Sequence, residues 1–460
     1  MTSPARPIGD RDVACLAHPY TNLKTHAATG PLVIGRGQGI RIYDQAGKEY
    51  IEAMAGLWCT SLGWGQERLV EAAAQAMRRL SFYHSFSGRV PDVTVELAER
   101  LLDLAPVPMS KVLFAGSGSE SNDTAVKLIW YYNNARGRPA KKKIVSRHKA
   151  YHGVTVATGS LTGLPANHRD FDLPIAGILH AGCPHHYRFG RPAETEEAFA
   201  TRLAEELEAM ILKEGPDTVA AFFAEPVMGA GGVIVPPAGY FAKVQAVLKK
   251  YDVLFVVDEV ICGFGRTGNR WGSQTFDLKP DLLTTAKALS SGYAPISALL
   301  ISEPIWQAMV EESAKIGIFG HGYTYGGHPV SAAVALETLK IYDDLNILDH
   351  VRALAPRLQD GLGRFADHPM VGDVRGVGLV GAVELVRDKA SRESFDPTQG
   401  VGATLVRHAQ AGGLILRALG DSIAFSPPLV ASEAEIDEIL ARFGRALDET
   451  WAWVRNQGLA

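Results

Sequence analysis

Residues 281–295 read DLLTTAKALSSGYAP, and a lysine, Lys287, directly follows the apolar and β-branched run LLTTA. Such a run, bounded by turn-forming residues, is typical of a strand that is buried on both faces. A lysine at this point is unusual because an unpaired ammonium group is costly to bury. The stretch therefore predicts an interior strand followed by a lysine with a chemical role.

Other short apolar runs of the same kind precede this one. They are VLF (112–114), KKIVS (142–146), VAAFFAEPV (219–227) and VLFVVDEVI (253–261). Amphipathic stretches with helical periodicity, such as residues 201–215 and 240–252, lie between them. This alternation predicts the α/β class, with a mostly parallel sheet flanked by helices in a large domain over residues 61–330. The two chain ends, residues 1–60 and 331–460, are expected to form a smaller α/β domain together.

The composition is that of a globular protein. The chain has 460 residues, of which 47% are hydrophobic and 21% charged, and this length favours more than one domain. A net charge of −4 without long basic runs argues against nucleic acid as a partner. The four scattered cysteines suggest a reducing compartment. Because the sequence has neither a signal-peptide pattern nor an apolar segment of membrane-spanning length, we expect a cytoplasmic protein with no membrane partner.

Polar residues follow three of the predicted strands. They are Glu225 after VAAFFA, Asp258 after LFVV, and Lys287 after LLTTA. In open α/β sheets, binding sites form beyond the carboxyl ends of the strands. Any one of these residues could instead be a buried ion-pair partner or a charge that reaches water. Three such residues on neighbouring strands favour a site.

The segment GSGSES (116–121) joins a predicted strand to a predicted helix. Its glycines allow a close backbone approach, and a helix start offers free N–H groups that attract anions. The segment therefore suits a phosphate, although a capped helix with a glycine turn is an equally good explanation by itself. It lacks the GxxxxGK[ST] pattern of a P-loop.

Two further patterns are not interpreted as sites. GVGLVG (376–381) matches GxGxxG but is followed by the strand-like AVELV, whereas a dinucleotide site requires a helix there. A nicotinamide dehydrogenase is therefore rejected. Four histidines, His148, His152, His185 and His186, show no metal-binding spacing and are interpreted as ordinary loop residues, so no metal is predicted.

A buried lysine, an aspartate at a strand end and a phosphate cradle together predict a pyridoxal-phosphate site. The lysine forms a Schiff base with the cofactor aldehyde, and the carboxylate keeps the pyridine nitrogen protonated so that the ring accepts electrons. Burial and the nearby cationic ring are expected to lower the pKa of Lys287, which provides the free amine needed for attack and for proton transfer. A non-catalytic binding protein would have no use for this lysine.

With these residues, the chain resembles the class III pyridoxal-phosphate aminotransferases, and within them the amine–pyruvate or omega-transaminase branch. The resemblance runs nearly end to end. It rests on MAGLWC (54–59), GSGSESND (116–123), YHG (151–153), AEP (224–226), GAGGVIVPP (229–237), VDEVICGFGRTG (257–268), AKALSSGY (286–293), HGYTYGGHP (321–329), DVRGVGLV (373–380) and LILRALGD (414–421). It implies fold type I of the pyridoxal-phosphate-dependent transferases.

The resemblance also implies roles for individual residues at the cofactor. The phosphate would be bound by Ser117, Gly118 and Ser119, and the two ring faces would be covered by Tyr151 and Val260. Asp258 would pair with the ring nitrogen with support from Glu225, and Lys287 would be the Schiff-base residue. Tyr323 and Thr324 would reach the phosphate of a neighbouring subunit. The protein is thus expected to be a homodimer with shared active sites, or a tetramer of such dimers.

For the substrates, the resemblance implies a pocket lined by Tyr20, Trp58, Phe86 and Tyr151, with Arg417 binding the acceptor carboxylate. Ala230 stands where relatives that act on ornithine or 4-aminobutyrate carry a glutamate, which favours amines over those amino acids. The expected reaction is a ping-pong transfer of an amino group from a primary amine (an omega-amine, polyamine or aryl-alkyl amine) to pyruvate, which gives alanine and an aldehyde or ketone. The alternative is another class III enzyme, an aminomutase or decarboxylase, acting on an amino acid.

Overall fold

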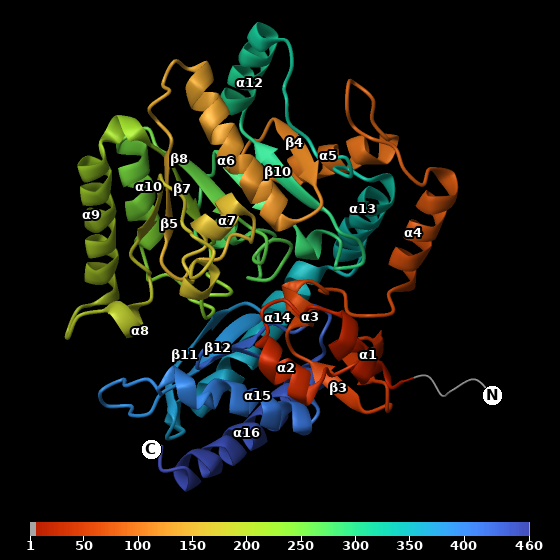
Figure 1. Cartoon of the computed structure of the whole chain (residues 1–460), viewed down its shortest axis with the longest axis vertical. Helices are drawn as coiled ribbons and strands as arrows, with labels where there is room; N and C mark the ends of the chain where they lie inside the picture. Colours follow the sequence, from red (N-terminus) through yellow and green to blue (C-terminus); the bar gives the residue numbers. More distant parts are fainter. Residues whose placement is uncertain (1–5, 460) are drawn as a thin grey trace.

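The computed structural model describes residues 6–459, and its centre is a seven-stranded sheet (Figure 1). The strand order is β4 (Lys111–Ala115), β10 (Ser297–Ile301), β9 (Leu282–Thr285), β8 (Leu254–Asp258), β7 (Val219–Ala224), β5 (Lys143–Arg147) and β6 (Ile178–Ala181). Strands β5 to β9 pair in parallel, and β10 is antiparallel to both β4 and β9. This arrangement confirms the mostly parallel sheet and every strand predicted for it.

Alternate residues of the central strands pack on opposite layers of helices. Phe222 of β7 belongs to a core cluster with α9 (Glu196–Glu214) and α10 (Tyr240–Lys250). Its neighbour Phe223 belongs to a cluster on the other face, with α6 (Gly118–Ala135) and α12 (Glu303–Ile316). Because side chains alternate along a strand, a strand covered on both faces has no polar position left. This is why the sequence shows continuous apolar runs.

A third core cluster lies beside β4 and β10 and continues into the smaller sheets. The helices that pack here are α4 (Glu67–Arg79), α5 (Asp92–Leu104) and α13 (Pro329–Asp344). The shorter helices elsewhere are α1 (Ile8–Cys15), α2 (Leu23–Thr29), α3 (Ala55–Trp58), α7 (Val156–Leu161), α8 (His186–Phe189) and α11 (Gly272–Thr275). In the described part of the chain, no helix is both long enough and apolar enough to cross a bilayer.

Residues from both chain ends share a small sheet. Its strands are β1 (Ile34–Gln38), β2 (Arg41–Asp44), β3 (Glu49–Glu52) and β13 (Leu414–Ile415). A second sheet contains β11 (Val371–Val377), β12 (Val380–Leu385), β15 (Ser422–Phe425) and β14 (Arg417–Leu419). Helices α14 (Ile347–Gly363), α15 (Val401–Ala411) and α16 (Glu433–Asn456) lie with these sheets, below the central sheet in Figure 1. The domain boundaries near residues 60 and 330 stay predictions.

The GVGLVG segment lies in this second sheet and forms a hairpin. Strands β11 and β12 are antiparallel, with Gly376 opposite Gly381 and Val377 opposite Val380. Gly378 in the turn has a φ of 60°, a value that glycine adopts without strain. Strand β12 follows the glycines, as the sequence predicts, where a dinucleotide site would require a helix.

Candidate active site

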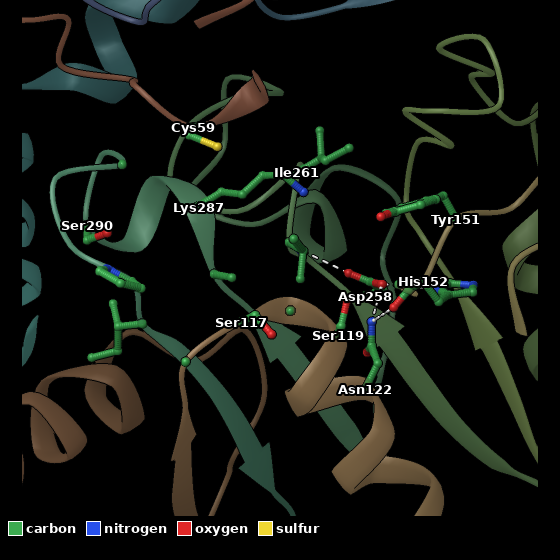
Figure 2. A pocket seen from close by; sticks show the side chains of 18 of the residues that line it. Cys59, Ser117, Ser119, Asn122, Tyr151, His152, Asp258, Ile261, Lys287 and Ser290 are labelled. Carbon is green, nitrogen blue, oxygen red and sulfur yellow. Dashed lines mark hydrogen bonds and ion pairs between the residues drawn. The ribbon is translucent and has the colours of Figure 1, made fainter. Parts of the chain in front are cut away.

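A cavity of about 370 Å³ lies at the carboxyl ends of the central strands (Figure 2). Eight of the predicted site residues line it, namely Ser117, Gly118, Ser119, Tyr151, Glu225, Asp258, Val260 and Lys287. They follow or end β4, β5, β7, β8 and β9, which are far apart in the sequence. In the sheet, β9, β8, β7 and β5 are neighbours, and β10 separates β9 from β4. The fold thus places them together as the sequence predicts. The side chains of Cys59, Asn122 and His152 also line the cavity.

The start of α6 forms one wall of the cavity. Ser117 is the N-cap, and its hydroxyl accepts the N–H of Glu120 at 3.2 Å. Gly118 begins the helix close to Val260, since a Cβ on Gly118 would lie 3.1 Å from a Val260 methyl group. The Ser119 hydroxyl accepts the N–H of Val154 at 3.3 Å. A helix start that faces a cavity, with no side chain on its first residue, suits a phosphate group.

Asp258, at the end of β8, is held by three donors. Its Oδ2 accepts a hydrogen bond from the Asn122 amide at 2.7 Å and one from Nδ1 of His152 at 2.8 Å. Its Oδ1 accepts the N–H of Val260 at 3.0 Å. Asp258 is only 4% exposed. These three contacts fix the orientation of the carboxyl group where it lines the cavity.

His152 is a site residue that the sequence analysis missed. The sequence predicts an ordinary loop histidine at this position, because the spacing of the histidines does not indicate a metal site. In the structure it is 2% exposed, stacks edge-on against Phe223 and contacts Asp258. Its Nε2 has no hydrogen-bond partner within residues 6–459. The only local signal is its place after Tyr151, and nothing in the sequence places it beside β8.

Glu225 follows β7 and organises the backbone around the cavity. One carboxylate oxygen accepts the N–H of Tyr151 at 3.0 Å, and the other accepts the N–H of Gly229 at 3.0 Å. Burial raises the pKa of this carboxyl group. Glu225 therefore fixes the position of Tyr151 and of the turn at Gly229.

Lys287 follows β9, and its φ of 46° is uncommon for a residue with a side chain. Burial lowers the pKa of its amine, as the sequence predicts. Three groups oppose this decrease in pKa, and in order of decreasing effect they are Cys59, Asp258 and Glu225. The lysine can therefore lose its proton more easily than a surface lysine. In Figure 2 its side chain extends along the cavity wall, with Cys59 nearby.

Tyr20 and Arg417 lie beside Tyr151. Burial raises the pKa of Tyr151, the nearby Tyr20 hydroxyl raises it further, and the Arg417 guanidinium opposes this increase. The Asn167 amide donates to the Tyr20 hydroxyl at 2.6 Å. Arg417 is half-buried, and burial lowers the pKa of its guanidinium. The neighbouring groups that oppose this decrease are Tyr151 and Tyr20. Within residues 6–459 it thus has no carboxylate partner.

The other predicted residues do not line the cavity of this single chain. Trp58 is 3% exposed and packs in a cluster with Ile261, which does line the cavity. Phe86 is 39% exposed and lies against Gly322. The Tyr323 hydroxyl donates to the Glu120 carbonyl at 3.2 Å, and Thr324 is exposed. Their roles stay predictions.

A mostly parallel sheet with a lysine, an aspartate and an anion cradle at one edge defines the fold type I transferases that depend on pyridoxal phosphate. The chain belongs to the class III aminotransferase family, whose sequence profile matches residues 23–447. It is 54% identical over 421 residues to gamma aminobutyrate transaminase 3, chloroplastic, of Solanum lycopersicum, covering 91% of this chain and 81% of the relative. It is 52% identical over 421 residues to gamma-aminobutyrate transaminase 1, mitochondrial, of Oryza sativa subsp. japonica, covering 91% and 82%.

Solved structures agree with this assignment. The omega transaminase from Pseudomonas jessenii in complex with PMP has a TM-score of 0.96 and 54% identity, covering 97% of this chain and 99% of that one. A thermostable omega transaminase variant, W58M/F86L/R417L, engineered for synthesis of bulky amines, has a TM-score of 0.96 and 53% identity, covering 97% and 100%.

The enzyme is thus an aminotransferase, and its cofactor is pyridoxal 5′-phosphate. The cavity fits this group on three independent grounds. The start of α6 is bare of side chain at Gly118, a buried carboxylate stands at the end of β8, and a lysine of lowered pKa is on the same wall. These match the phosphate, the ring nitrogen and the aldehyde of the cofactor, respectively.

Proposed function

We propose that the enzyme transfers an amino group from a primary amine to pyruvate by a ping-pong mechanism, releasing an aldehyde or ketone and then alanine. The observation that carries this proposal is Arg417. It is a half-buried guanidinium beside Tyr151 and without a carboxylate partner within residues 6–459. A guanidinium in this state is suited to bind the carboxylate of a keto acid through two parallel hydrogen bonds.

The cofactor ring, when bound, takes up the electrons released as the substrate loses a proton. We assign its phosphate to Ser117, Gly118 and Ser119. Asp258 would pair with the ring nitrogen and hold it protonated, and Asn122 and His152 would keep its carboxyl group in position. Tyr151 and Val260 would cover the ring faces, and Glu225 would support Tyr151 through its backbone N–H.

Lys287 would hold the cofactor aldehyde between turnovers and then move the substrate proton. A base for this step must be neutral when it acts, and its pKa should lie near the working pH. The decrease in the pKa of Lys287 that burial causes acts in this direction. The carboxylates of Asp258 and Glu225 oppose it, so the balance is set within the cavity itself.

The amine would occupy the space bounded by Tyr20, Tyr151 and Trp58, with Phe86 at its margin. Support comes from the engineered omega transaminase named above, whose substitutions W58M, F86L and R417L serve the synthesis of bulky amines. This chain carries the same three residue types at the same numbers. Ile261, which packs with Trp58 and lines the cavity, would connect the two regions.

We further propose a homodimer in which Tyr323 and Thr324 reach the cofactor phosphate of the neighbouring subunit. The loop that carries them lies next to α6, whose start forms the phosphate cradle. Thr324 and Tyr325 are exposed, as are Phe82 and Phe86 nearby. An apolar surface of this kind is typical of an interface. Tetramers would be pairs of such dimers.

We place the enzyme in the cytoplasm, in keeping with four cysteines that form no disulfide. The plant relatives carry the words chloroplastic and mitochondrial in their names, so location is a property to be measured. Fractionation of the producing cells, with the native protein detected by antibody, tests this assignment.

A second donor class is favoured by the names of the relatives, which are gamma-aminobutyrate transaminases. We infer that 4-aminobutyrate is a candidate donor beside amines that lack a carboxylate. Relatives that act on 4-aminobutyrate carry a glutamate at the position of Ala230, and such a carboxylate could pair with the arginine. Without it, the Arg417 guanidinium would be available in both half-reactions, so it could bind the carboxylate of 4-aminobutyrate or that of pyruvate. Ala230 predicts that this donor is disfavoured, whereas the names of the relatives favour it, so the rates with 4-aminobutyrate and with carboxylate-free amines are to be compared directly.

The spectrum of the bound cofactor tests the proposal. An amine donor should bleach the visible band, and pyruvate should restore it with one equivalent of alanine formed per site. A panel with an aliphatic omega-amine, a polyamine, an aryl-alkyl amine and 4-aminobutyrate ranks the donors. An aminomutase or decarboxylase would turn over an amino acid without forming alanine from pyruvate, and that result would overturn the proposal.

A further inference from the structure

Three side chains that can bind a metal meet in the N-terminal segment, and none of them lines the cofactor cavity. Asp12 lies on α1, His26 on α2, and His18 in the loop between them. The Nε2 of His18 lies 2.9 and 3.0 Å from the two carboxylate oxygens of Asp12. The Nε2 of His26 lies 2.9 Å from Oδ2. We call these three residues the N-terminal His–Asp cluster.

The cluster is sheltered and yet reachable from solvent. The side chains of Asp12 and His26 are 13% and 11% exposed, and that of His18 is 26% exposed. The two imidazole rings pack together with centroids 4.1 Å apart. Within residues 6–459, Asp12 has ion-pair contacts only with the two histidines. No arginine or lysine there neutralises its charge.

A second group of similar composition makes a useful contrast. His185, Asp373 and Glu384 also place their ligand atoms within 4.8 Å of one another. There, however, Nη1 of Arg375 lies 2.6 Å from each carboxylate. Arg188 also pairs with Glu384. Fixed guanidinium groups already supply the cations in that group, whereas the N-terminal His–Asp cluster has none.

We propose that Asp12, His18 and His26 bind one divalent transition-metal ion of the Zn²⁺ type. Two imidazoles and a carboxylate are a ligand set that Zn²⁺ uses, with a water in the fourth position. Ligand atoms at about 2.0–2.2 Å from a tetrahedral ion lie about 3.3–3.6 Å from one another. The three ligand atoms of the cluster already lie within 4.8 Å of one another. Their nitrogen–oxygen distances of 2.9 to 3.0 Å would lengthen by only about 0.3–0.7 Å when the ion binds. Mg²⁺ and Ca²⁺ prefer oxygen ligands and should bind poorly.

The ion would join α1 to α2 and so restrain the loop that carries Tyr20. Tyr20 has a φ of 50°, an uncommon value for a residue with a side chain, and its hydroxyl accepts a hydrogen bond from Asn167. The same hydroxyl influences the pKa of Tyr151 in the cofactor cavity. Metal binding would thus stabilise the segment that carries Tyr20 without taking part in the reaction.

Isothermal titration of the cofactor-loaded, tag-free protein with Zn²⁺ tests the site. The wild type should bind one ion per chain, and His26→Gln should weaken this binding at least about 100-fold, because it removes a direct ligand. Asp12→Asn should do the same. His350→Gln changes a partly buried histidine on α14 and should leave the site intact. Mg²⁺ should not compete with Zn²⁺.

A further readout separates binding at the cluster from binding elsewhere. Zn²⁺ should raise the melting temperature of the wild type and of His350→Gln, but not that of His26→Gln. If the wild type binds no Zn²⁺, or if His26→Gln binds it with unchanged stoichiometry and affinity, the proposal is wrong. Circular dichroism in metal-free buffer checks that each variant is folded. If Asp12→Asn is not folded, the binding result for His26→Gln alone decides the test.

Discussion

Replacing Arg417 by alanine should separate the two half-reactions of the enzyme. The guanidinium is half-buried, stands beside Tyr151 and has no carboxylate partner in the described residues, so the substitution leaves no acid unpaired. Under the proposed function, it removes the partner of a substrate carboxylate. Pyruvate has such a group and a simple amine does not, and the loss should therefore fall on the pyruvate half-reaction.

The size of the loss follows from the burial of Arg417. Removing one partner of a buried, hydrogen-bonded charge pair costs about 2–5 kcal/mol. Because Arg417 is half-buried, water compensates part of the loss, and we expect the lower part of that range, about 2–3 kcal/mol. At about 1.4 kcal/mol per factor of ten, the second-order rate constant with pyruvate should fall about 30- to 150-fold.

Stopped-flow absorbance of the bound cofactor measures each half-reaction separately. The rate with a carboxylate-free amine should change less than about threefold. The rate with 4-aminobutyrate as donor should fall about as much as the rate with pyruvate, about 30-fold or more. Arg417→Lys should show an intermediate loss, because an ammonium group keeps the charge without the two-pronged geometry. Arg352→Ala, at an exposed arginine on α14, is the matched control. Equal losses with the carboxylate-free amine and with pyruvate would refute the carboxylate role and indicate a structural one.

Four other changes have defined outcomes. Lys287→Ala should retain cofactor and lose turnover, and near-normal cycling of amine to alanine would exclude the lysine as the catalytic amine. Asp258→Asn should lower activity by orders of magnitude with an unchanged melting temperature, since an amide cannot hold the ring nitrogen protonated; an unchanged rate would remove Asp258 from the site. Mixing Lys287→Ala with Thr324→Ala subunits should restore up to about a quarter of wild-type sites if sites are shared, whereas an active monomer in light scattering would contradict sharing. Burial and nearby histidines lower the pKa of His180 to about 4 from 6.5. The unfolded chain then binds the proton more tightly, so the free energy of unfolding should fall by up to about 2 kcal/mol between pH 6.5 and 5. Urea titrations of the wild type and His180→Gln check this, and parallel pH profiles would disprove it.

The central sheet and the core of the site could be predicted from the sequence because their signals are local. A strand covered on both faces must be apolar throughout, and LLTTA and VAAFFA show this directly. A residue that follows such a strand must lie at the carboxyl edge of the sheet. Lys287, Asp258 and Glu225 therefore meet at one cavity whatever the details of the helices.

Contacts between distant segments were decided by the tertiary structure alone. The bond from His152 to Asp258 joins residues 106 positions apart, and no periodic pattern encodes such a pairing. The stretch around Arg417 shows the same limit. Leu414 and Ile415 pair with β3, whereas Arg417 to Leu419 pair with β15 in a different sheet.

That division of one short apolar stretch between two sheets places the guanidinium near Tyr151. In the same way, a turn between two helices brings His26 to Asp12 across 14 positions. Local sequence patterns report which face of an element is buried, because burial depends on the period of the side chains. Which elements then meet depends on the packing of the whole chain, and this packing decides the position of Arg417 beside Tyr151 and brings the N-terminal His–Asp cluster together.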